Sequence, residues 1–275
     1  MSQLPKIGRY SFRVEQYQCN VRKMLRFSSL VNIMLSAADY HSTERGFGTI
    51  YLNEMGKTWV LSRLAVEMER IPSRHQEITI ETWIDKVHPL FTSRNFRALS
   101  REGEVLGWGR SVWAMIDTTT RHPVDLMEIH NGLITTFIVN EDDKEFLNVP
   151  IDRPAKIQLD EPSLFRIDNT YFSDVDFNGH INSMRYVDHV LDIFPLSWHK
   201  KNNIKRLDIA FIAEGRPEVP IKIYGTTNHT NAVALGEDNH TDYLFKIMQD
   251  LPENSEESEA CRLRLRTIPL VGAEL

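Results

Sequence analysis

Cysteines are few in this chain of 275 residues, and long apolar runs and a positive net charge are missing. Cys19 and Cys261 form no C-x-x-C pair, which argues against a disulfide scaffold or a cysteine zinc site and fits a reducing cytosol. No apolar run reaches the roughly 18 residues of a membrane-spanning helix. The net charge of −6 argues against general nucleic-acid binding. We therefore expect a protein that binds neither membranes nor nucleic acids.

Several enzyme motifs are also missing. The chain has no G-x-S-x-G elbow, no G-x-x-x-x-G-K-[ST] phosphate loop and no H-E-x-x-H motif. The stretch GEVLGWG at 103–109 lacks the spacing of a dinucleotide site, and the ten histidines are scattered without metal-ligand spacing. The first residues, MSQLPKIGRYSF, resemble neither a secretion signal nor a transit peptide. These absences predict a cytoplasmic protein without metal or organic cofactor.

What is present describes an ordinary globular chain, with 41% apolar and 25% charged residues. Residues 9–25 read as one extended segment. A helical stripe follows, and its members are Leu30, Ile33, Met34, Ala37, Ala38 and His41. We expect His41 to be a core histidine, with a catalytic role as the alternative. Strand-like runs come next, including a hairpin around Glu102-Gly103.

The composition shifts between Asn140 and Pro162, where acidic residues and then three prolines cluster. Prolines remove ladder donors and disfavour helix, so 141–162 is predicted to be a linker between domains at 1–140 and 163–275. After it the order of strand, helix and several strands returns. The simplest architecture is α+β: two antiparallel sheets, each wrapped around a long central helix.

The stretch YFSDVDFNGHINSMRYVDHVLDIF, 171–194, is the most informative one. Its apolar residues from Val187 to Phe194 have helical spacing, and Asp176 or Asn178 is a suitable N-cap. A helix N-terminus offers free amides and a field that favours negative charge. We therefore predict that the backbone amides of Gly179 and His180 could stabilise an oxyanion at the start of this helix.

Glu214 is the second candidate, at the end of the predicted strand IKRLDIAFIAEG. A carboxylate at the edge of an apolar row can act as a base or orient a water molecule. The residues alone leave plainer interpretations open: Glu214 as a solvent-facing strand end, Asp176 and Asn178 as caps, and His180 as a first-turn residue.

The segment DFNGHIN at 176–182, with Tyr186 after it, resembles the D-x-N-x-H-V-N-N-x-x-Y signature of acyl-acyl-carrier-protein thioesterases, both plant enzymes and bacterial relatives. FIAEG at 211–215 places Glu214 on the catalytic Glu of that family, and 57–83 resembles its W-x-L-x-R…P…V-x-T-W stretch. The resemblance extends from about Tyr10 to Thr267. Ser183 and Gly215 depart from it, in place of an Asn and of the plant enzymes' Cys. The second departure implies that no thiol nucleophile is required.

The resemblance implies a tandem hot-dog fold and hydrolysis of fatty acyl thioesters of acyl carrier protein (ACP). Asn178, His180 and Glu214 would hold and activate a water molecule, with Asp176 ordering the start of the helix. By the same resemblance the second half carries catalysis, and the first half shapes an acyl tunnel in which Met34, Ala37 and Ala38 could lie. Basic residues would steer the acidic ACP; the candidates are Arg22, Lys23, Arg26, Lys200, Lys201, Lys205 and Arg206.

Three alternatives stay open. An acyl-CoA thioesterase would keep the fold and change the substrate. A non-catalytic module that binds acyl thioesters would keep the pocket alone, and a hot-dog dehydratase would use a His and a carboxylate for other chemistry. A monomer and a homodimer are both compatible with two fused hot-dog domains.

Overall fold

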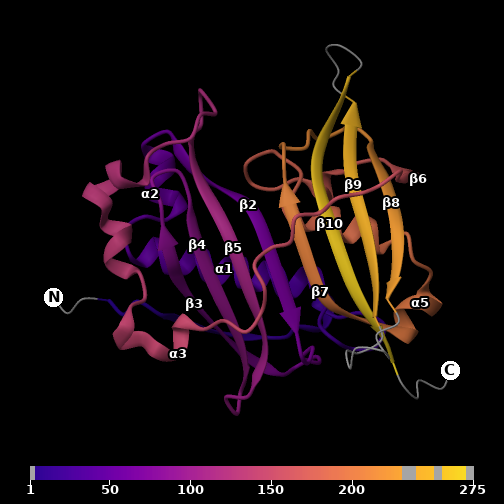
Figure 1. Cartoon of the computed structure of the whole chain (residues 1–275), viewed down its shortest axis with the longest axis horizontal. Helices are drawn as coiled ribbons and strands as arrows, with labels where there is room; N and C mark the ends of the chain where they lie inside the picture. The colour runs from indigo at the N-terminus through magenta and orange to yellow at the C-terminus, as the bar shows by residue number, and fades with distance from the viewer. Residues whose placement is uncertain (1–3, 231–239, 251–255, 271–275) are drawn as a thin grey trace. The chain divides into compact units, whose positions relative to one another are not determined.

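The computed structural model describes residues 4–230, 240–250 and 256–270, and the chain divides into two compact units (Figure 1). The first unit spans Met1–Pro154 and the second Ala155–Leu275. Each is an antiparallel sheet with helices packed against it, as the tandem hot-dog prediction requires.

The first unit has strands in the order β1-β3-β4-β5-β2. Its strands are β1 Gly8–Arg13, β2 Lys57–Met68, β3 Glu77–Val87, β4 Thr92–Ser100 and β5 Val105–Asp117. Its helices are η1 Gln16–Gln18, α1 Phe27–Glu44, α2 Thr49–Glu54, η2 Leu126–Phe137, η3 Glu141–Asp143 and α3 Lys144–Leu147. Helix α1 packs on β3 and β1, and the whole predicted stripe from Leu30 to His41 is buried. The predicted hairpin of β4 and β5 is confirmed, with Gly103 at a φ of +86°.

The second unit repeats this arrangement, with strands in the order β7-β10-β9-β8-β6. Its strands are β6 Ser163–Asp168, β7 Asn202–Phe211, β8 Ile221–Thr230, β9 His240–Asp250 and β10 Glu257–Pro269. Its helices are η4 Phe172–Asp174, α4 Ser183–Leu191 and α5 Leu196–Lys201. The expectation of a second long helix is wrong, because α4 has 9 residues where α1 has 18. Helix α4 still buries an apolar face: Met184, Tyr186, Val187 and Val190.

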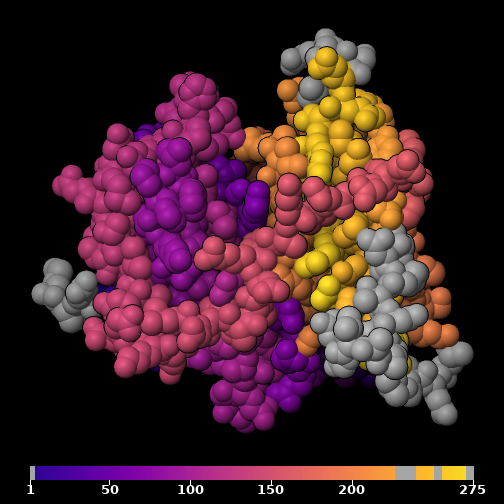
Figure 2. All heavy atoms as spheres, in the orientation of Figure 1, coloured from indigo at the N-terminus to yellow at the C-terminus, as the bar shows by residue number. Residues whose placement is uncertain are grey.

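The predicted linker 141–162 is largely attached to the two units. Phe146, Val149 and Ile151 pack with Trp83 in a core cluster of the first unit. Within the second unit, the Ala155 amide donates to the Asp208 carboxylate at 3.0 Å. Figure 2 shows that the chain after Ala155 lies across β10, on one face of the second unit's sheet. Apolar residues before and between the prolines therefore anchor this segment, which a count of prolines and acidic residues could not reveal.

The extended segment predicted for 9–25 is a strand only as far as Arg13. It continues as η1 and then as a turn closed by a bridge between Cys19 and Leu25. In the second unit β6 likewise leads into η4 and a turn closed by a bridge between Val175 and Ile181. The turn in the second unit contains the signature residues.

Candidate active site

The signature residues lie in a tight turn, residues 176–180, between the bridged Val175 and Ile181. The Asp176 amide donates to the His180 carbonyl at 2.8 Å. The Asp176 carboxylate oxygen Oδ1 accepts from the amides of Asn178 at 2.8 Å and His180 at 3.2 Å. Aspartate side chains commonly close turns in this way. Asp176 therefore orders the loop that bears His180.

Gly179 lies at the one left-handed position of this turn, with a φ of +81°. Glycine adopts this conformation without steric cost. A Cβ placed on Gly179 would meet no atom within 4 Å, so backbone conformation rather than crowding favours glycine here. The same open space leaves room for an approaching substrate.

Two expectations about the helix are wrong. Helix α4 begins at Ser183, and its N-cap is Asn182, whose side chain accepts from the Met184 amide at 2.9 Å. The amides of Gly179 and His180 also already donate within the turn, to the Asp176 carbonyl at 3.0 Å and to its carboxylate. The signature thus forms a turn that precedes the helix, and its amides are not free helix-terminal donors.

Glu214 reaches the turn from a different part of the second unit. Strand β7 ends at Phe211, so Glu214 lies in the loop before β8 and not in the predicted strand. Its Oε2 lies 3.5 Å from Nε2 of His180, with 38% and 37% of the two side chains exposed. Solvent therefore reaches a histidine and a carboxylate that stand next to each other.

Asn178 is an exposed member of the candidate site. Within the described parts of the chain its carboxamide makes no hydrogen bond. The structure thus pairs His180 with Glu214 and ties Asp176 to the backbone of the turn, but it brings the Asn178 side chain against neither member of the pair.

A buried acidic layer supports the turn, and sequence reasoning missed it. Asp174 is almost fully buried, accepts from the Tyr171 amide at 2.8 Å and is bound by Arg185 at 2.9 Å. His189 lies between Asp174 and Asp168, with its Nδ1 3.2 Å from Asp168. Burial favours the neutral acid, but the bonds from Tyr171 and Arg185 and the charge of His189 outweigh it and lower the pKa of Asp174. The alternation of Asp174 with Asp176 was the available signal.

The first unit contains a second copy of the turn. Asn20 Oδ1 accepts from the amides of Arg22 at 2.9 Å and Met24 at 3.2 Å. The Asn20 amide donates to the Met24 carbonyl at 2.8 Å, and Lys23 has a φ of +63°. By position Met24 stands where His180 stands in the second unit.

The loop that faces each turn is also repeated. The Leu25 amide donates to the Pro72 carbonyl at 2.9 Å, and the Ile181 amide donates to the Gly215 carbonyl at 3.2 Å. Ile71 therefore corresponds to Glu214. The first unit therefore repeats the backbone hydrogen bonds of the candidate site, but it has neither the histidine nor the carboxylate.

Family models match both halves of the chain. The model of the acyl-ACP thioesterase N-terminal domain matches residues 6–131, and that of the C-terminal domain matches residues 161–266. The chain belongs to the acyl-ACP thioesterase family. Both matches contain a copy of the turn, and the C-terminal match contains the His180–Glu214 pair.

Members of the acyl-ACP thioesterase family are similar over most of this chain. An acyl-ACP thioesterase from Bacteroides thetaiotaomicron has 32% identity and a TM-score of 0.80, over 95% of this chain and 98% of that one. The 12:0-ACP thioesterase from Umbellularia californica has the same fold, with 21% identity and a TM-score of 0.74 over 96% of this chain and 95% of that one.

Among curated relatives, a chloroplastic palmitoyl-acyl carrier protein thioesterase from Gossypium hirsutum is 25% identical over 83% of this chain and 58% of its own length. A chloroplastic oleoyl-acyl carrier protein thioesterase from Arabidopsis thaliana is 22% identical over 93% of this chain and 75% of its own. This chain therefore spans about three-fifths to three-quarters of these plant proteins.

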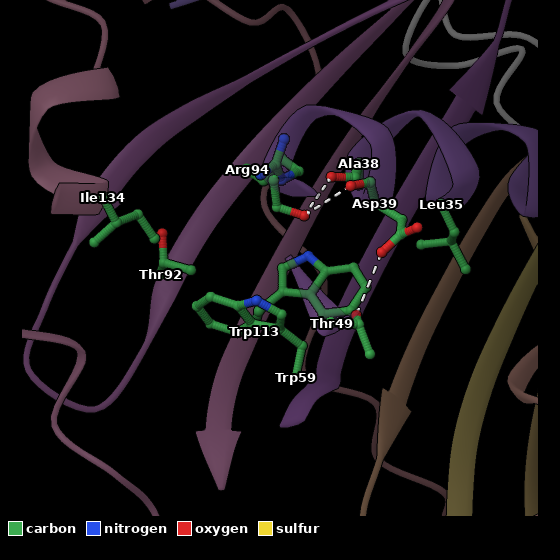
Figure 3. A pocket seen from close by; sticks show the side chains of 10 residues that line it. Leu35, Ala38, Asp39, Thr49, Trp59, Thr92, Arg94, Trp113 and Ile134 are labelled. Carbon is green, nitrogen blue, oxygen red and sulfur yellow. Dashed lines mark hydrogen bonds between the residues drawn. The ribbon is translucent and has the colours of Figure 1, made fainter. Parts of the chain in front are cut away.

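The first unit of this family member holds a pocket of about 70 Å³ beside α1 (Figure 3). Its apolar wall is formed by Leu35, Ala38, Trp59, Trp113 and Ile134. Of the residues expected to line a tunnel, Ala38 lies in this wall, whereas Met34 and Ala37 are core residues outside it.

Arg94 is a buried cation on the wall of the same pocket, and its Nη1 donates to Thr82 at 3.2 Å. Burial and the charge of Arg45 lower the pKa of Arg94 to about 9. His41 is fully buried and lies 2.9 Å from the Lys6 carbonyl through Nε2. Burial, with Arg94 and Arg45, lowers its pKa to about 2, so His41 is a neutral core histidine.

The two cysteines and the remaining described titratable groups do not suggest a second chemistry. Cys19 and Cys261 are free thiols, and burial raises the pKa of each. In the described ranges no three His, Cys, Asp or Glu side chains are placed to hold a metal ion. Across those ranges no helix combines the length and apolar character needed to cross a bilayer.

Proposed function

We propose that this protein hydrolyses fatty acyl thioesters of ACP, releasing a free fatty acid and the thiol of the carrier. The main support for the site is that His180 Nε2 lies 3.5 Å from Glu214 Oε2 and that solvent reaches both side chains. The palmitoyl- and oleoyl-acyl carrier protein thioesterases and the 12:0-ACP thioesterase described above are named for ACP substrates, which supports ACP as the substrate carrier.

The reaction needs a water molecule that loses a proton as it attacks the thioester carbon. Glu214 accepts this proton, and His180 holds the water and the carboxylate in line. The tetrahedral intermediate then collapses, the carbon–sulfur bond breaks and the thiolate leaves. The proton taken from the water returns to the sulfur through the same pair, so atoms and charge balance without a covalent enzyme intermediate.

The developing oxyanion needs a donor that is not already used. The amides of Gly179 and His180 could serve only by giving up their bonds to Asp176. The free carboxamide of Asn178 requires no such exchange. We therefore assign the oxyanion donor to Asn178, a type of donor whose loss costs roughly a hundredfold to a thousandfold in rate.

The docking of ACP would use basic side chains that remain on the surface. Arg206 is excluded from this role, because it is buried and ion-paired with Asp208 at 2.9 Å. Lys200 and Lys201 are exposed on α5, and Lys23 and Arg26 are exposed in the first unit. A net charge of −6 makes such local patches necessary for steering an acidic partner. The two free cysteines suit a reducing compartment such as the cytoplasm.

The pocket of the first unit would accept part of the acyl chain. Its two indoles, Trp59 and Trp113, and the Ala38 methyl group give it an apolar wall of the kind that binds ligands. A larger side chain at Ala38 would shorten the space available to the chain. Ala38→Leu should therefore lower kcat/KM for long acyl substrates more than for short ones.

The decisive experiment is single-turnover hydrolysis of ACP and CoA thioesters of several chain lengths. Wild type is compared with His180→Ala, Glu214→Ala and Asn178→Ala, and with Met24→Ala and Ile71→Ala as matched changes in the first unit. We expect the first three to lose at least about a hundredfold in rate, and the matched changes to stay within about twofold of wild type.

Three results would change the proposal. Equal rates on CoA and ACP thioesters would favour the acyl-CoA alternative. Tight acyl-thioester binding without turnover by wild type would indicate a binding module. Full activity of both His180→Ala and Glu214→Ala would remove the site while leaving the substrate class in place.

A further inference from the structure

The backbone around Glu214 is held on both sides by the second unit. The amides of Ile212 and Ala213 donate to the Ala260 carbonyl at 2.9 and 3.2 Å. On the other side, the Gly215 carbonyl accepts from the Ile181 amide at 3.2 Å. Because Ile181 follows His180 directly, this last bond joins the loop of Glu214 to the turn of His180.

Gln249, near the end of β9, makes three hydrogen bonds to the segment that follows Glu214. Its Oε1 accepts from the Arg216 amide at 2.9 Å. Its Nε2 donates to the carbonyls of Arg216 at 3.0 Å and Val219 at 2.8 Å. Gln249 is 4% exposed, so water cannot readily replace these bonds.

Tyr186 supports the same segment from α4. A Cβ placed on Gly215 would lie 1.9 Å from the Tyr186 hydroxyl oxygen and 3.1 Å from Oε1 of Gln249. Gly215 is thus enclosed between a phenol and a carboxamide. Tyr186 is 2% exposed, and burial raises the pKa of its phenol far above the ordinary value, so the hydroxyl stays neutral against this backbone.

We propose that Gln249 and Tyr186 are positioning residues that hold Gly215 from two sides and so fix the Glu214 carboxylate against His180. This rests on the proposed roles of Glu214 and His180 in thioester hydrolysis. Neither Gln249 nor Tyr186 has to touch the substrate. The contact also accounts for the glycine at 215, because in this chain a side chain there would displace the loop or the phenol.

The first unit provides a matched control. The Ser73 amide, which corresponds to the Arg216 amide, donates to Oε1 of Gln76 at 2.8 Å. Gln76→Met removes this bond beside the copy of the turn that lacks the histidine and the carboxylate. Gln249→Met removes the corresponding bond from the Arg216 amide, beside the turn that has the histidine and the carboxylate.

The test is single-turnover and steady-state hydrolysis of an acyl-ACP by wild type, Gln249→Met and Gln76→Met. Because a displacement of about 1 Å can cost roughly a hundredfold in rate, we expect Gln249→Met to lose at least about tenfold in kcat. KM should change little, and Gln76→Met should match wild type. In a Glu214→Ala background Gln249→Met should lower kcat no further, since the group that it positions is gone.

A second pair of variants tests the contact without removing the bonds of Gln249. Gly215→Ala should lower kcat, and Tyr186→Phe added to it should restore part of the loss by removing the oxygen that the new methyl group meets. A double variant no better than Gly215→Ala would overturn the role of Tyr186. This pair also keeps the proposal testable if Gln249→Met does not fold.

The two proposals can fail separately. An inactive Glu214→Ala beside a fully active Gln249→Met would overturn the positioning role alone. An equal loss from Gln249→Met with and without Glu214 would do the same, because it would show general damage to the fold. Full activity of Glu214→Ala would overturn the proposed site and its supports together.

Discussion

Asn20 and Asp176 close the same turn in the two units, and yet the two turns differ in what they can do. Each side chain accepts two backbone amides through Oδ1, with distances of 2.9 and 3.2 Å for Asn20 and 2.8 and 3.2 Å for Asp176. Met24 in one turn replaces His180 in the other, and Ile71 in the facing loop replaces Glu214. Backbone geometry and the proposed catalytic chemistry are therefore specified by different residues.

The largest expected difference comes from the residues that close the turns. Asp176→Ala and Asn20→Ala each remove one acceptor from two amides, so each should cost about 1–2 kcal/mol of the free energy of unfolding. Asp176→Ala should also lower kcat by about tenfold to a hundredfold, because it releases His180, and Asn20→Ala should leave kcat unchanged. Thermal melts and single-turnover rates measure the two effects, and a loss of activity in both variants would contradict the assignment of catalysis to the second unit.

Asp176→Asn refines the same comparison, because asparagine is the natural residue at position 20. It keeps the acceptor oxygen, so its melting temperature should stay near that of wild type and its loss of kcat should be smaller than that of Asp176→Ala. A loss as large as that of Asp176→Ala with an unchanged melting temperature would show that the reaction needs the charge of Asp176.

The second prediction concerns the stability of the two turns at acidic pH. In the first unit the Gln18 side chain accepts from the Glu15 amide at 2.9 Å. In the second unit the Asp174 carboxylate accepts from the Tyr171 amide in the same way. The folded pKa of Asp174 is lowered from its ordinary 3.8. Its contribution to stability is therefore present above about pH 4 and is lost as the pH falls through the lower folded value. The amide of Gln18 does not titrate in this range.

Hydrogen exchange measured as the pH is lowered below about 4 should show this asymmetry. Residues 171–182 should lose protection before residues 15–26. Asp174→Asn should remove the excess acid sensitivity of the second segment at some cost in stability at neutral pH. Loss of protection in both segments at the same pH would argue against the role of Asp174.

The smallest expected effect lies at the left-handed position of each turn. Gly179→Ala puts a side chain at a φ of +81°, which should cost about 1 kcal/mol of the free energy of unfolding after the entropy gain of replacing glycine. Lys23→Gly relieves a similar strain at +63°, but it frees the unfolded chain by a similar amount, so the net change should be within about 0.5 kcal/mol. Chemical denaturation checks both. Equal and opposite changes would show that the unfolded chain contributes little.

The sequence predicted the elements that rest on periodicity, and it was less informative where tertiary contacts decide. The stripe from Leu30 to His41, the β4–β5 hairpin and the two-sheet architecture follow from spacing and turn residues, and all are present. The start of α4 was misplaced because Asp176, Asn178 and Asn182 are all suitable caps. Only the bridge between Val175 and Ile181 distinguishes a turn from a first helical turn.

The pairing of His180 with Glu214 came from family resemblance, since no local pattern joins residues 34 positions apart. Gln249 carried no signal, because a glutamine at a strand end is common. Tyr186 was visible only as the last residue of the family signature, and nothing in the sequence linked it to Gly215. The copy of the turn at 20–24 was missed for another reason: its hydrogen bonds need only one side-chain acceptor and a positive φ, and the rest of its sequence differs.

The autonomy of the turn has a consequence for how such enzymes can change over generations. A backbone that holds its shape with either Asn or Asp in place, and with either Lys or Gly at the left-handed position, does not depend on the residues proposed to perform chemistry. Substitutions at the His180 and Glu214 positions can therefore remove or introduce a reactive centre while the domain still folds. In a chain with two such turns, selection for turnover can act on the residues of one turn while the residues of the other vary.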